Sequence, residues 1–250
     1  MVFPLYDDNS DRTTFPFVNY AIIAANVLVF VFFQQLGTNS NFTYAFSTVP
    51  LEIITGRDVI TASRILVDPV TGQRLMFPGL EATPLSVYFT LFTSMFMHGG
   101  FWHIGGNMLF LWIFGDNIED RLGHVRYIVF YLLCGVIAAL AHVFATYALA
   151  TDQGGLLVPT LGASGAISGV LGGYVLLHPT RRVTVILFRF LTDVPAYVVI
   201  GIWFAFQLIS GLGMLGRGSQ QGGVAYGAHI GGFVAGLALI KLFDLGHRRQ

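Results

Sequence analysis

The amino-acid sequence predicts an all-α polytopic membrane protein with six membrane-spanning helices. Of its 250 residues, 54% are hydrophobic and 10% are charged, whereas soluble domains carry about 25% charged residues. The mean hydropathy is +0.69. Apolar segments alternate with polar connections along the chain, and about 20 apolar residues in a helix cross the ~30 Å hydrocarbon core of a bilayer.

The six predicted spans are residues 16–33, 102–114, 127–149, 156–177, 194–215 and 224–243. The second is short and follows another apolar stretch, residues 85–97. Two spans of ordinary length with a reversal do not fit between residues 85 and 114. We therefore expect residues 85–97 to form a re-entrant or interfacial helix, whose backbone must be satisfied by protein or water.

A polar connection, residues 37–84, follows the first span and is too long for a tight turn. Within it, residues 65–76 contain the turn sequence Asp-Pro-Val-Thr-Gly and predict a β-hairpin. The predicted organisation is an N-terminal tail over 1–15, a six-span domain over 16–243 with a first loop at about 37–100, and a C-terminal tail over 244–250.

The distribution of basic residues predicts that both tails are cytoplasmic. The positive-inside rule gives most weight to short loops and chain ends. In a six-span topology one side receives Arg12, Arg121, Arg126, Arg181, Arg182, Arg189, Lys241, Arg248 and Arg249. The other receives Arg217 in its short loops, and Arg57, Arg64 and Arg74 in the long one. We expect a multi-pass protein of the plasma (inner) membrane.

The first span is expected to be retained. Three Asp residues and one Arg precede it, which is the wrong charge order for a cleaved signal peptide.

Composition also argues against several ligands. The formal net charge is zero and the 13 Lys and Arg residues form no clustered stripe, so nucleic-acid binding is not expected. The single cysteine, Cys134, rules out an internal disulfide and an all-protein thiolate metal site. The metal-binding sequence H-E-x-x-H is missing, and we expect neither a metal nor an organic cofactor.

Four polar side chains lie at the start of predicted spans, where burying them near lipid requires a reason. His103 and Asn107 lie one helical turn apart in the second span, Ser164 lies in the fourth and His229 in the sixth. These three spans enter the membrane from the same side in the predicted topology. We therefore expect the four side chains at one depth, roughly 8–12 Å below the outer surface.

A serine and a histidine at one depth predict nucleophilic catalysis. A hydroxyl is a weak nucleophile until an imidazole takes its proton, and the oxyanion that follows needs hydrogen-bond donors. Ser164 and His229 are the candidate pair, with His103, Asn107 and the Ser164 backbone N–H as candidate donors. The apolar segments carry no Asp or Glu at this depth, which favours a dyad over a triad.

Such a dyad requires the fourth and sixth spans to touch closely. Small residues at every fourth position predict this contact, and they are Gly165, Gly169 and Gly173 on one span and Ala228, Gly232 and Gly236 on the other.

The remaining serine and histidine residues are expected to be structural. We predict that Ser168 bonds back to its own helix, that His142 and His178 pack between helices, and that His98, His124 and His247 face water or lipid headgroups.

These motifs resemble those of the rhomboid family of intramembrane serine proteases, over about residues 88–242. The resemblance rests on His-Gly-Gly-Phe-Trp-His-Ile-Gly-Gly-Asn at 98–107, Gly-Ala-Ser-Gly at 162–165 and Ala-His-Ile-Gly-Gly at 228–232. Residues 114–123 are similar to the family's turn after the second span, where Glu119 would order the inner loop. The resemblance implies a six-helix rhomboid bundle with a long first loop partly embedded in the outer leaflet.

At matching positions the resemblance implies Ser164 as nucleophile, His229 as base and then acid, and an oxyanion site from His103, Asn107 and the Ser164 amide. Gly162 would bind substrate. The resemblance further implies cleavage of single-span membrane proteins within the lipid bilayer, without a cofactor. Residues 194–215 would form a movable gate and residues 216–223 a cap.

The sequence departs from the family pattern in two features. Phe89 and Thr90 stand where many members carry Trp-Arg, and Ser168 stands where many place an aromatic ring against the histidine. Ring packing on His229 must therefore come from elsewhere, with Phe233 and Tyr226 as candidates.

Three other functions remain as alternatives. A transporter or channel places its site near the midplane between internal repeats, and the sequence shows no such repeats. A metalloprotease needs a histidine and carboxylate ligand set at one depth. A catalytically inactive rhomboid-like protein that binds membrane proteins typically lacks the serine or the histidine, and this chain has both.

Overall fold

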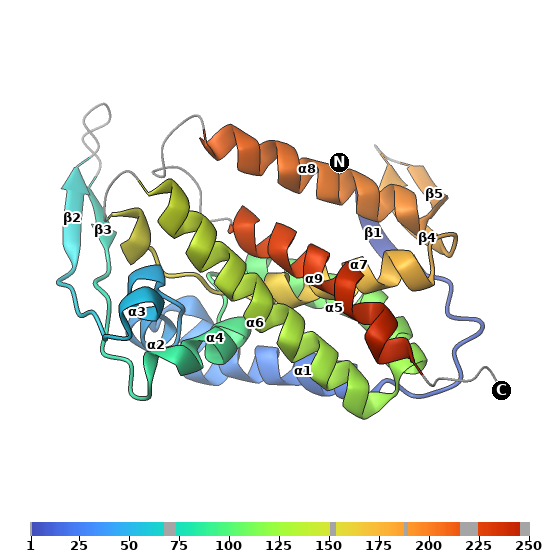
Figure 1. Ribbon diagram of the computed structural model, residues 1–250, viewed down its shortest axis with the longest axis horizontal. Coiled ribbons are helices and arrows are strands. Elements are labelled where there is room, and N and C mark those ends of the chain that lie inside the picture. The colour runs from blue at the N-terminus through green and yellow to red at the C-terminus, as the bar shows by residue number, and fades with distance from the viewer. Residues whose placement is uncertain (1, 68–73, 151–153, 188–189, 216–224, 246–250) are drawn as a thin grey trace.

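The protein is a helical bundle with a small β-sheet at each end (Figure 1). The computed structural model describes residues 2–67, 74–150, 154–187, 190–215 and 225–245. The α-helices are α1 (Phe17–Leu28), α2 (Ser40–Ala45), α3 (Pro50–Thr55), α4 (Thr90–Thr93), α5 (Phe101–Leu122), α6 (His124–Leu149), α7 (Ser164–Leu177), α8 (Ala196–Leu215) and α9 (Tyr226–Asp244). The strands are β1 (Val2–Asp7), β2 (Arg64–Val67), β3 (Arg74–Phe77), β4 (Arg182–Leu187) and β5 (Phe190–Pro195).

Helix α7 is the most enclosed element of the bundle. It packs against α5, α6 and α9, and every residue from Gly165 to Tyr174 is buried. Aromatic side chains from the neighbouring helices fill the space around it. Helix α1 packs on α5, and α8 packs on α9 from the outside. The helix that begins with Ser164 is therefore surrounded by protein.

Helices α7 and α9 touch backbone to backbone. A Cβ atom on Gly232 would lie 2.1 Å from the carbonyl oxygen of Gly165, and one on Gly236 would lie 2.0 Å from that of Gly169. Side-chain carbons do not approach backbone oxygens this closely, so only glycine permits the contact. The predicted small-residue contact between these two segments is confirmed.

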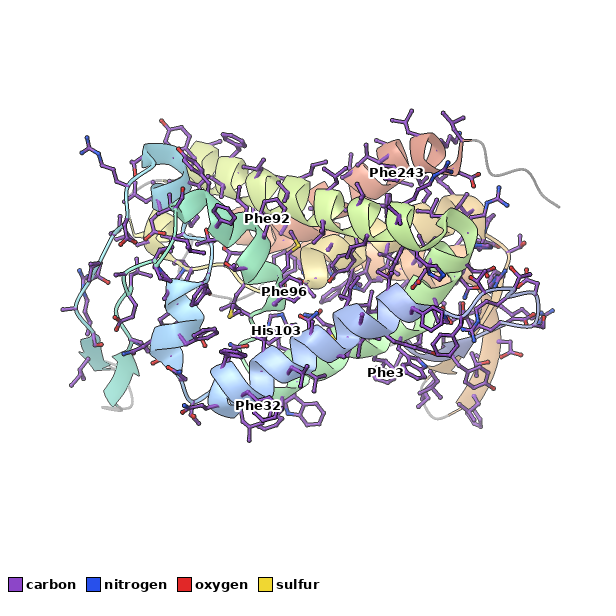
Figure 2. The ribbon with its side chains drawn as sticks, turned by 90° about the horizontal axis from the view of Figure 1, so that it is seen from below. Phe3, Phe32, Phe92, Phe96, His103 and Phe243 are labelled. Atoms are coloured by element: carbon purple, nitrogen blue, oxygen red, sulfur yellow. The ribbon has the colours of Figure 1, made fainter. Side chains whose placement is uncertain are left out.

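Two of the described helices, α6 and α9, are long and apolar enough to cross a bilayer by length and composition. Shorter apolar helices cover 17–33, where the π-helical Val29–Phe33 continues α1, and also 87–96, 164–177 and 196–211. Large apolar side chains lie on the outside of the bundle. Phe32 is 67% exposed and Trp102 is 95% exposed, and Figure 2 shows Phe32 and Phe3 at the edge of the ribbon. This surface suits contact with lipid.

The fourth predicted span, residues 156–177, is wrong at its start because α7 begins at Ser164. The preceding chain is a short 3₁₀ turn, Gly155–Leu157, and then a non-helical segment. That segment is held by a β-bridge between Thr160 and Thr48 of the first loop. Ser164 is thus the first residue of its helix, not a residue several positions down it.

The predicted turn over residues 114–123 is also wrong. Helix α5 continues to Leu122, and the chain turns at Gly123, where φ is 77°. The polar residues of this stretch stay helical because other elements satisfy their side chains. Glu119 accepts hydrogen bonds from the Val18 and Asn19 amides at 2.9 and 2.6 Å, which are among the unpaired donors at the start of α1. Glu119 thus joins α5 to the start of α1, whereas the resemblance implied that it orders an inner loop.

The first loop contains the predicted β-hairpin. Strands β2 and β3 pair antiparallel with Arg64 opposite Phe77, and the predicted turn, 68–72, lies outside the described residues. The 85–97 stretch forms short helical turns over 87–96, too short to span a bilayer. Thr48 Oγ1 donates to the carbonyl of Thr90 at 2.9 Å, so α4 is anchored to the rest of the first loop.

A three-stranded sheet that the sequence did not predict joins the N-terminal tail to the segment before α8. Strand β4 pairs antiparallel with β1 on one side and with β5 on the other. Strand β5 ends at Pro195 and α8 begins at the next residue. This sheet lies at the opposite end of the bundle from the β2–β3 hairpin (Figure 1). The first residues of the chain therefore fix the base of α8.

Asp7 at the end of β1 is a buried carboxyl group, 6% exposed. Its Oδ2 accepts hydrogen bonds from the Tyr174 hydroxyl and the Asn117 amide, while Oδ1 is buried without a hydrogen-bond partner among the described residues. Burial raises the pKa of Asp7 to about 7, and nearby Asp116 adds to the rise, although Tyr174 and Arg181 oppose it. Asp7 therefore holds its proton in the folded protein at mildly acidic pH.

We predict that Gly236→Ala lowers the free energy of unfolding by about 1–3 kcal/mol, because the added methyl group forces α7 and α9 apart. Gly201→Ala is the matched control, since a Cβ there meets nothing within 4 Å, and alanine is the better helix former. Thermal unfolding in detergent, followed by circular dichroism, compares the two variants. Equal melting temperatures would contradict the close-contact assignment.

We also predict that stability falls as pH rises through the acidic range. Asp7 binds its proton more tightly when folded, so its contribution is lost between the ordinary pKa of 3.8 and about 7. Asp7→Asn keeps an oxygen acceptor and should flatten the dependence of the melting temperature on pH by about 5 °C across this range. Asp8→Asn, at an exposed carboxylate, should not flatten it. Identical slopes for wild type and Asp7→Asn would show that Asp7 is ionised when folded.

Candidate active site

Ser164 is presented by a glycine turn at the start of α7. Gly162 has φ of 124°, a conformation that favours glycine, and its N–H donates to the Ser94 carbonyl at 2.8 Å. Because Ser164 is the first residue of the helix, its backbone N–H has no intrahelical acceptor. The turn therefore exposes both the hydroxyl and the amide of one residue at the positive end of the helix dipole.

His229 lies in the first turn of α9 and faces Ser164. Its Nε2 is 2.8 Å from the Ser164 Oγ, a normal hydrogen-bond distance. The other ring nitrogen, Nδ1, is 2.8 Å from Oε1 of Gln207 on α8. An amide oxygen only accepts, so Nδ1 carries the proton and Nε2 is free to accept one. This tautomer can act as a base toward the serine hydroxyl.

Aromatic rings from α8 and α9 surround the His229 imidazole. The Trp203 ring centroid lies 6.0 Å from it, and that of Tyr226 lies 6.4 Å from it in an edge-on arrangement. Of the two candidates from sequence, Tyr226 is in ring contact with His229, whereas Phe233 contacts Trp203 and Phe204. Ser168 bonds back to the Ser164 carbonyl at 2.6 Å, as predicted. Position 168 therefore supplies no aromatic ring to His229.

His103, in the first turn of α5, borders the serine from the side of Gly162. Its Nδ1 accepts the N–H of Gly99 at 3.3 Å, which leaves the proton of a neutral ring on Nε2. A Cβ built on Gly162 would lie 2.8 Å from that Nε2 and 3.6 Å from the Ser164 Oγ. Figure 2 shows His103 between α1 and the segment that carries Phe96. The Nε2–H of His103 therefore lies beside the serine hydroxyl.

Asn107, predicted to donate a hydrogen bond to the oxyanion, contacts His98 in the structure. Its Nδ2 lies 2.9 Å from Nε2 of His98, and both side chains are buried. The expectation that His98 faces water or headgroups is wrong, because the residue is 0% exposed and its backbone bonds to the side chain of Gln34. The His98 ring also packs edge-on against His103 at 5.1 Å. Asn107 and His98 thus support His103 from one side. The other histidine expected to face water or headgroups near the C-terminus, His247, lies outside the described residues.

A small cavity of about 30 Å³ lies beside the serine. Its lining includes Ser164 and Gly162, Met95 from the 87–96 segment, Ala138 and Ala139 of α6, and Ala228 of α9. A space of this size holds about one or two water molecules or a small side chain. Within the described part of the chain, no three His, Cys, Asp or Glu side chains are grouped so that they could hold a metal ion.

The structure brings Ser164, His229 and His103 together and adds residues that the sequence reasoning missed. Gln207 and Trp203 contact the imidazole from α8. A signal for Gln207 was available, because it is an uncharged amide within an otherwise apolar segment and such residues need a partner in a membrane. His98 was missed because a histidine before a Gly-Gly pair looks like a loop residue.

The fold and the site together define a helical membrane protein with a paired serine and histidine at the ends of two adjoining helices. Residues 86–244 match the family model of the rhomboid domain. The chain therefore belongs to the rhomboid family, whose members are membrane proteins.

Curated relatives agree with this assignment. The chain is 33% identical over 144 residues to Rhomboid protein 1, mitochondrial, of Saccharomyces cerevisiae, covering 58% of this chain and 38% of that protein. It is 30% identical over 153 residues to Rhomboid protease GluP of Bacillus subtilis, covering 61% and 26%. It is 30% identical over 167 residues to the human Presenilin-associated rhomboid-like protein, mitochondrial, covering 66% and 34%. The chain thus matches less than two fifths of each relative's length.

We predict that Gly162→Ala lowers the rate at which a serine-reactive fluorophosphonate labels Ser164 by at least tenfold. The alanine strains a left-handed turn, at about 1–3 kcal/mol, and its methyl group collides with the His103 ring. Gly123→Ala is the matched control because its φ is also positive, at 77°, but nothing lies within 4 Å of its Cβ. Equal labelling rates in the two variants would contradict the arrangement of Gly162 and His103.

Proposed function

We propose that the protein is an intramembrane serine endopeptidase that cleaves the transmembrane segments of other membrane proteins. The observation that carries the proposal is the 2.8 Å approach of Ser164 Oγ to His229 Nε2. The tautomer set by Gln207 leaves Nε2 as the acceptor of the serine proton. Ser164 is the proposed nucleophile and His229 the proposed base and acid.

The reaction proceeds through an acyl-enzyme. Ser164 Oγ attacks the scissile carbonyl carbon while its proton passes to Nε2 of His229, and the carbonyl oxygen becomes an oxyanion. The imidazolium then protonates the leaving nitrogen as the C–N bond breaks. A water molecule, deprotonated by the same nitrogen, hydrolyses the ester and restores the Ser164 hydroxyl.

The oxyanion is stabilised by donors already in position. The Ser164 backbone N–H lies at the helix start, where it has no acceptor within its own helix, and His103 Nε2–H lies beside the same space next to Gly162. Asn107 remains a proposed contributor, with one amide hydrogen on His98 and the other available. Gly162 lines the path by which the substrate backbone approaches, since a larger residue would fill it.

The substrate is proposed to be a single-span protein whose helix unwinds locally at small residues. The cavity beside Ser164 is about 30 Å³ and is lined mostly by small residues, so it fits alanine or serine next to the scissile bond better than phenylalanine. An intact helix keeps its carbonyls hydrogen-bonded, so local unwinding is needed before attack.

We further propose six membrane spans, with both termini on the same, cytoplasmic side of the plasma (inner) membrane. Contact among the segments assigned to that side supports placing them on one side of the membrane, because β1 pairs with β4 and Arg121 bonds to Asp244 at 2.6 Å. The short helical segment at 87–96 exposes Tyr88, Phe89 and Phe92. Tyrosine is typical of a membrane interface and phenylalanine of the apolar face of an interfacial helix, which supports a first loop partly embedded in the outer leaflet. The cap at 216–223 lies outside the described residues.

We expect purified wild-type protein in liposomes to cut a fluorogenic transmembrane peptide, and Ser164→Ala and His229→Ala to lose at least a thousandfold in kcat/KM. The controls are Ser168→Ala and His178→Gln, which change a serine and a histidine outside the proposed dyad and should retain most activity. Circular dichroism establishes that all four variants remain folded.

A wild-type protein that cuts no peptide, and whose Ser164 is not labelled by a fluorophosphonate, would overturn the proposal. The chain would then be better described as a catalytically inactive rhomboid-like protein that binds other membrane proteins.

A further inference from the structure

Helix α8 places an amide against the imidazole that the proposed reaction uses. Gln207 is 6% exposed, although it lies in a helix composed almost entirely of apolar residues. Its Oε1 lies 2.8 Å from Nδ1 of His229. Burying an amide beside lipid is costly unless it is hydrogen-bonded, and the bond to His229 provides that partner.

Trp203 reinforces the same contact from one helical turn earlier. Residues four apart share a face of a helix, so Trp203 and Gln207 both face His229. The Trp203 ring is tilted by 39° to the imidazole, and the Gln207 oxygen lies at the ring nitrogen Nδ1. The stacking of Phe204 on Phe233, with centroids 4.2 Å apart, fastens this face of α8 to α9. The position of His229 thus depends on a helix that lies on the outside of the bundle (Figure 1).

We propose that Gln207 is the positioning residue of the Ser164–His229 pair. Its side-chain oxygen holds the proton on Nδ1, which keeps Nε2 unprotonated and aimed at the Ser164 hydroxyl. Because Gln207 belongs to α8, this hydrogen bond forms where α8 packs against α9. This inference rests on the proposed protease function for its kinetic consequence, but the tautomer it assigns is independent of any substrate.

Among the described residues, no carboxylate is hydrogen-bonded to His229, whose two ring nitrogens contact Gln207 and Ser164. The titratable side chains near enough to influence it are His103 on α5 and His142 on α6. Ser168, one turn below Ser164, is bonded to the backbone of its own helix. Gln207 is therefore the group that fixes the imidazole, as a carboxylate does in a three-residue site.

The first test is kinetic. Gln207→Leu removes the acceptor at similar volume and should lower kcat about 10–100-fold with little change in KM, because an unpaired Nδ1–H and a mixed tautomer disfavour the reacting state. Gln207→Glu restores an acceptor, and should recover most of kcat while moving the acid limb of the pH profile to higher pH, because a carboxylate stabilises the imidazolium. Ser210→Ala, which removes a polar group from the same helix one turn further on, is the control and should match wild type.

The second test reads the tautomer directly. Nitrogen-15 NMR of protein labelled at histidine, with the His229 signals assigned by their loss in His229→Gln, should show Nδ1 protonated in wild type and a mixture of tautomers in Gln207→Leu. A purely structural role for Gln207 would not give this change together with recovery in Gln207→Glu.

The outcomes separate the two proposals. Cleavage by wild type with unchanged kcat and unchanged tautomer in Gln207→Leu would overturn the role of Gln207 and leave the protease function standing. A wild type that does not cleave, but whose His229 tautomer depends on Gln207, would overturn the protease function and support the positioning role.

Discussion

The backbone contact between α7 and α9 is the constraint on which the site depends. Ser164 and His229 lie on different helices, and a 2.8 Å hydrogen bond between short side chains requires the two helix axes to be close. Gly232 and Gly236 permit this because their α-carbons lie against the carbonyl oxygens of Gly165 and Gly169. Any side chain at these positions would separate the two helices. It would thereby also separate Ser164 from His229.

The side chains of the proposed catalytic site lie at helix starts. Ser164 opens α7, while His103 and His229 lie in the first turns of α5 and α9. A helix start leaves backbone N–H groups unpaired and carries a positive partial charge, so it suits a site where negative charge develops. A non-helical glycine precedes two of these helices, Gly162 before α7 and Gly100 before α5. The segment before α7 is held by the β-bridge between Thr160 and Thr48 of the first loop.

Helix α8 connects this site to the other end of the molecule. It touches His229 through Gln207 and Trp203, and its base continues directly from β5 of the three-stranded sheet. That sheet includes β1 of the N-terminal tail, whose last residue, Asp7, is bonded to Tyr174 of α7. The tail is therefore joined to the core helix by the Asp7–Tyr174 hydrogen bond and to the outer helix by the strands of the sheet, at the end of the bundle opposite the β2–β3 hairpin.

The sequence by itself determined the helical membrane class, the glycine contact and the pairing of Ser164 with His229 as candidates, because hydropathy, small-residue spacing and polar residues in apolar segments are local signals. It also located the β2–β3 hairpin. Only the tertiary structure decided that α7 starts at Ser164, that α5 runs to Leu122, and that Asn107 bonds to His98. The sheet with β1 and the contact of Gln207 with His229 likewise join residues far apart in the chain. Such contacts depend on how helices and strands pack, which no local pattern encodes.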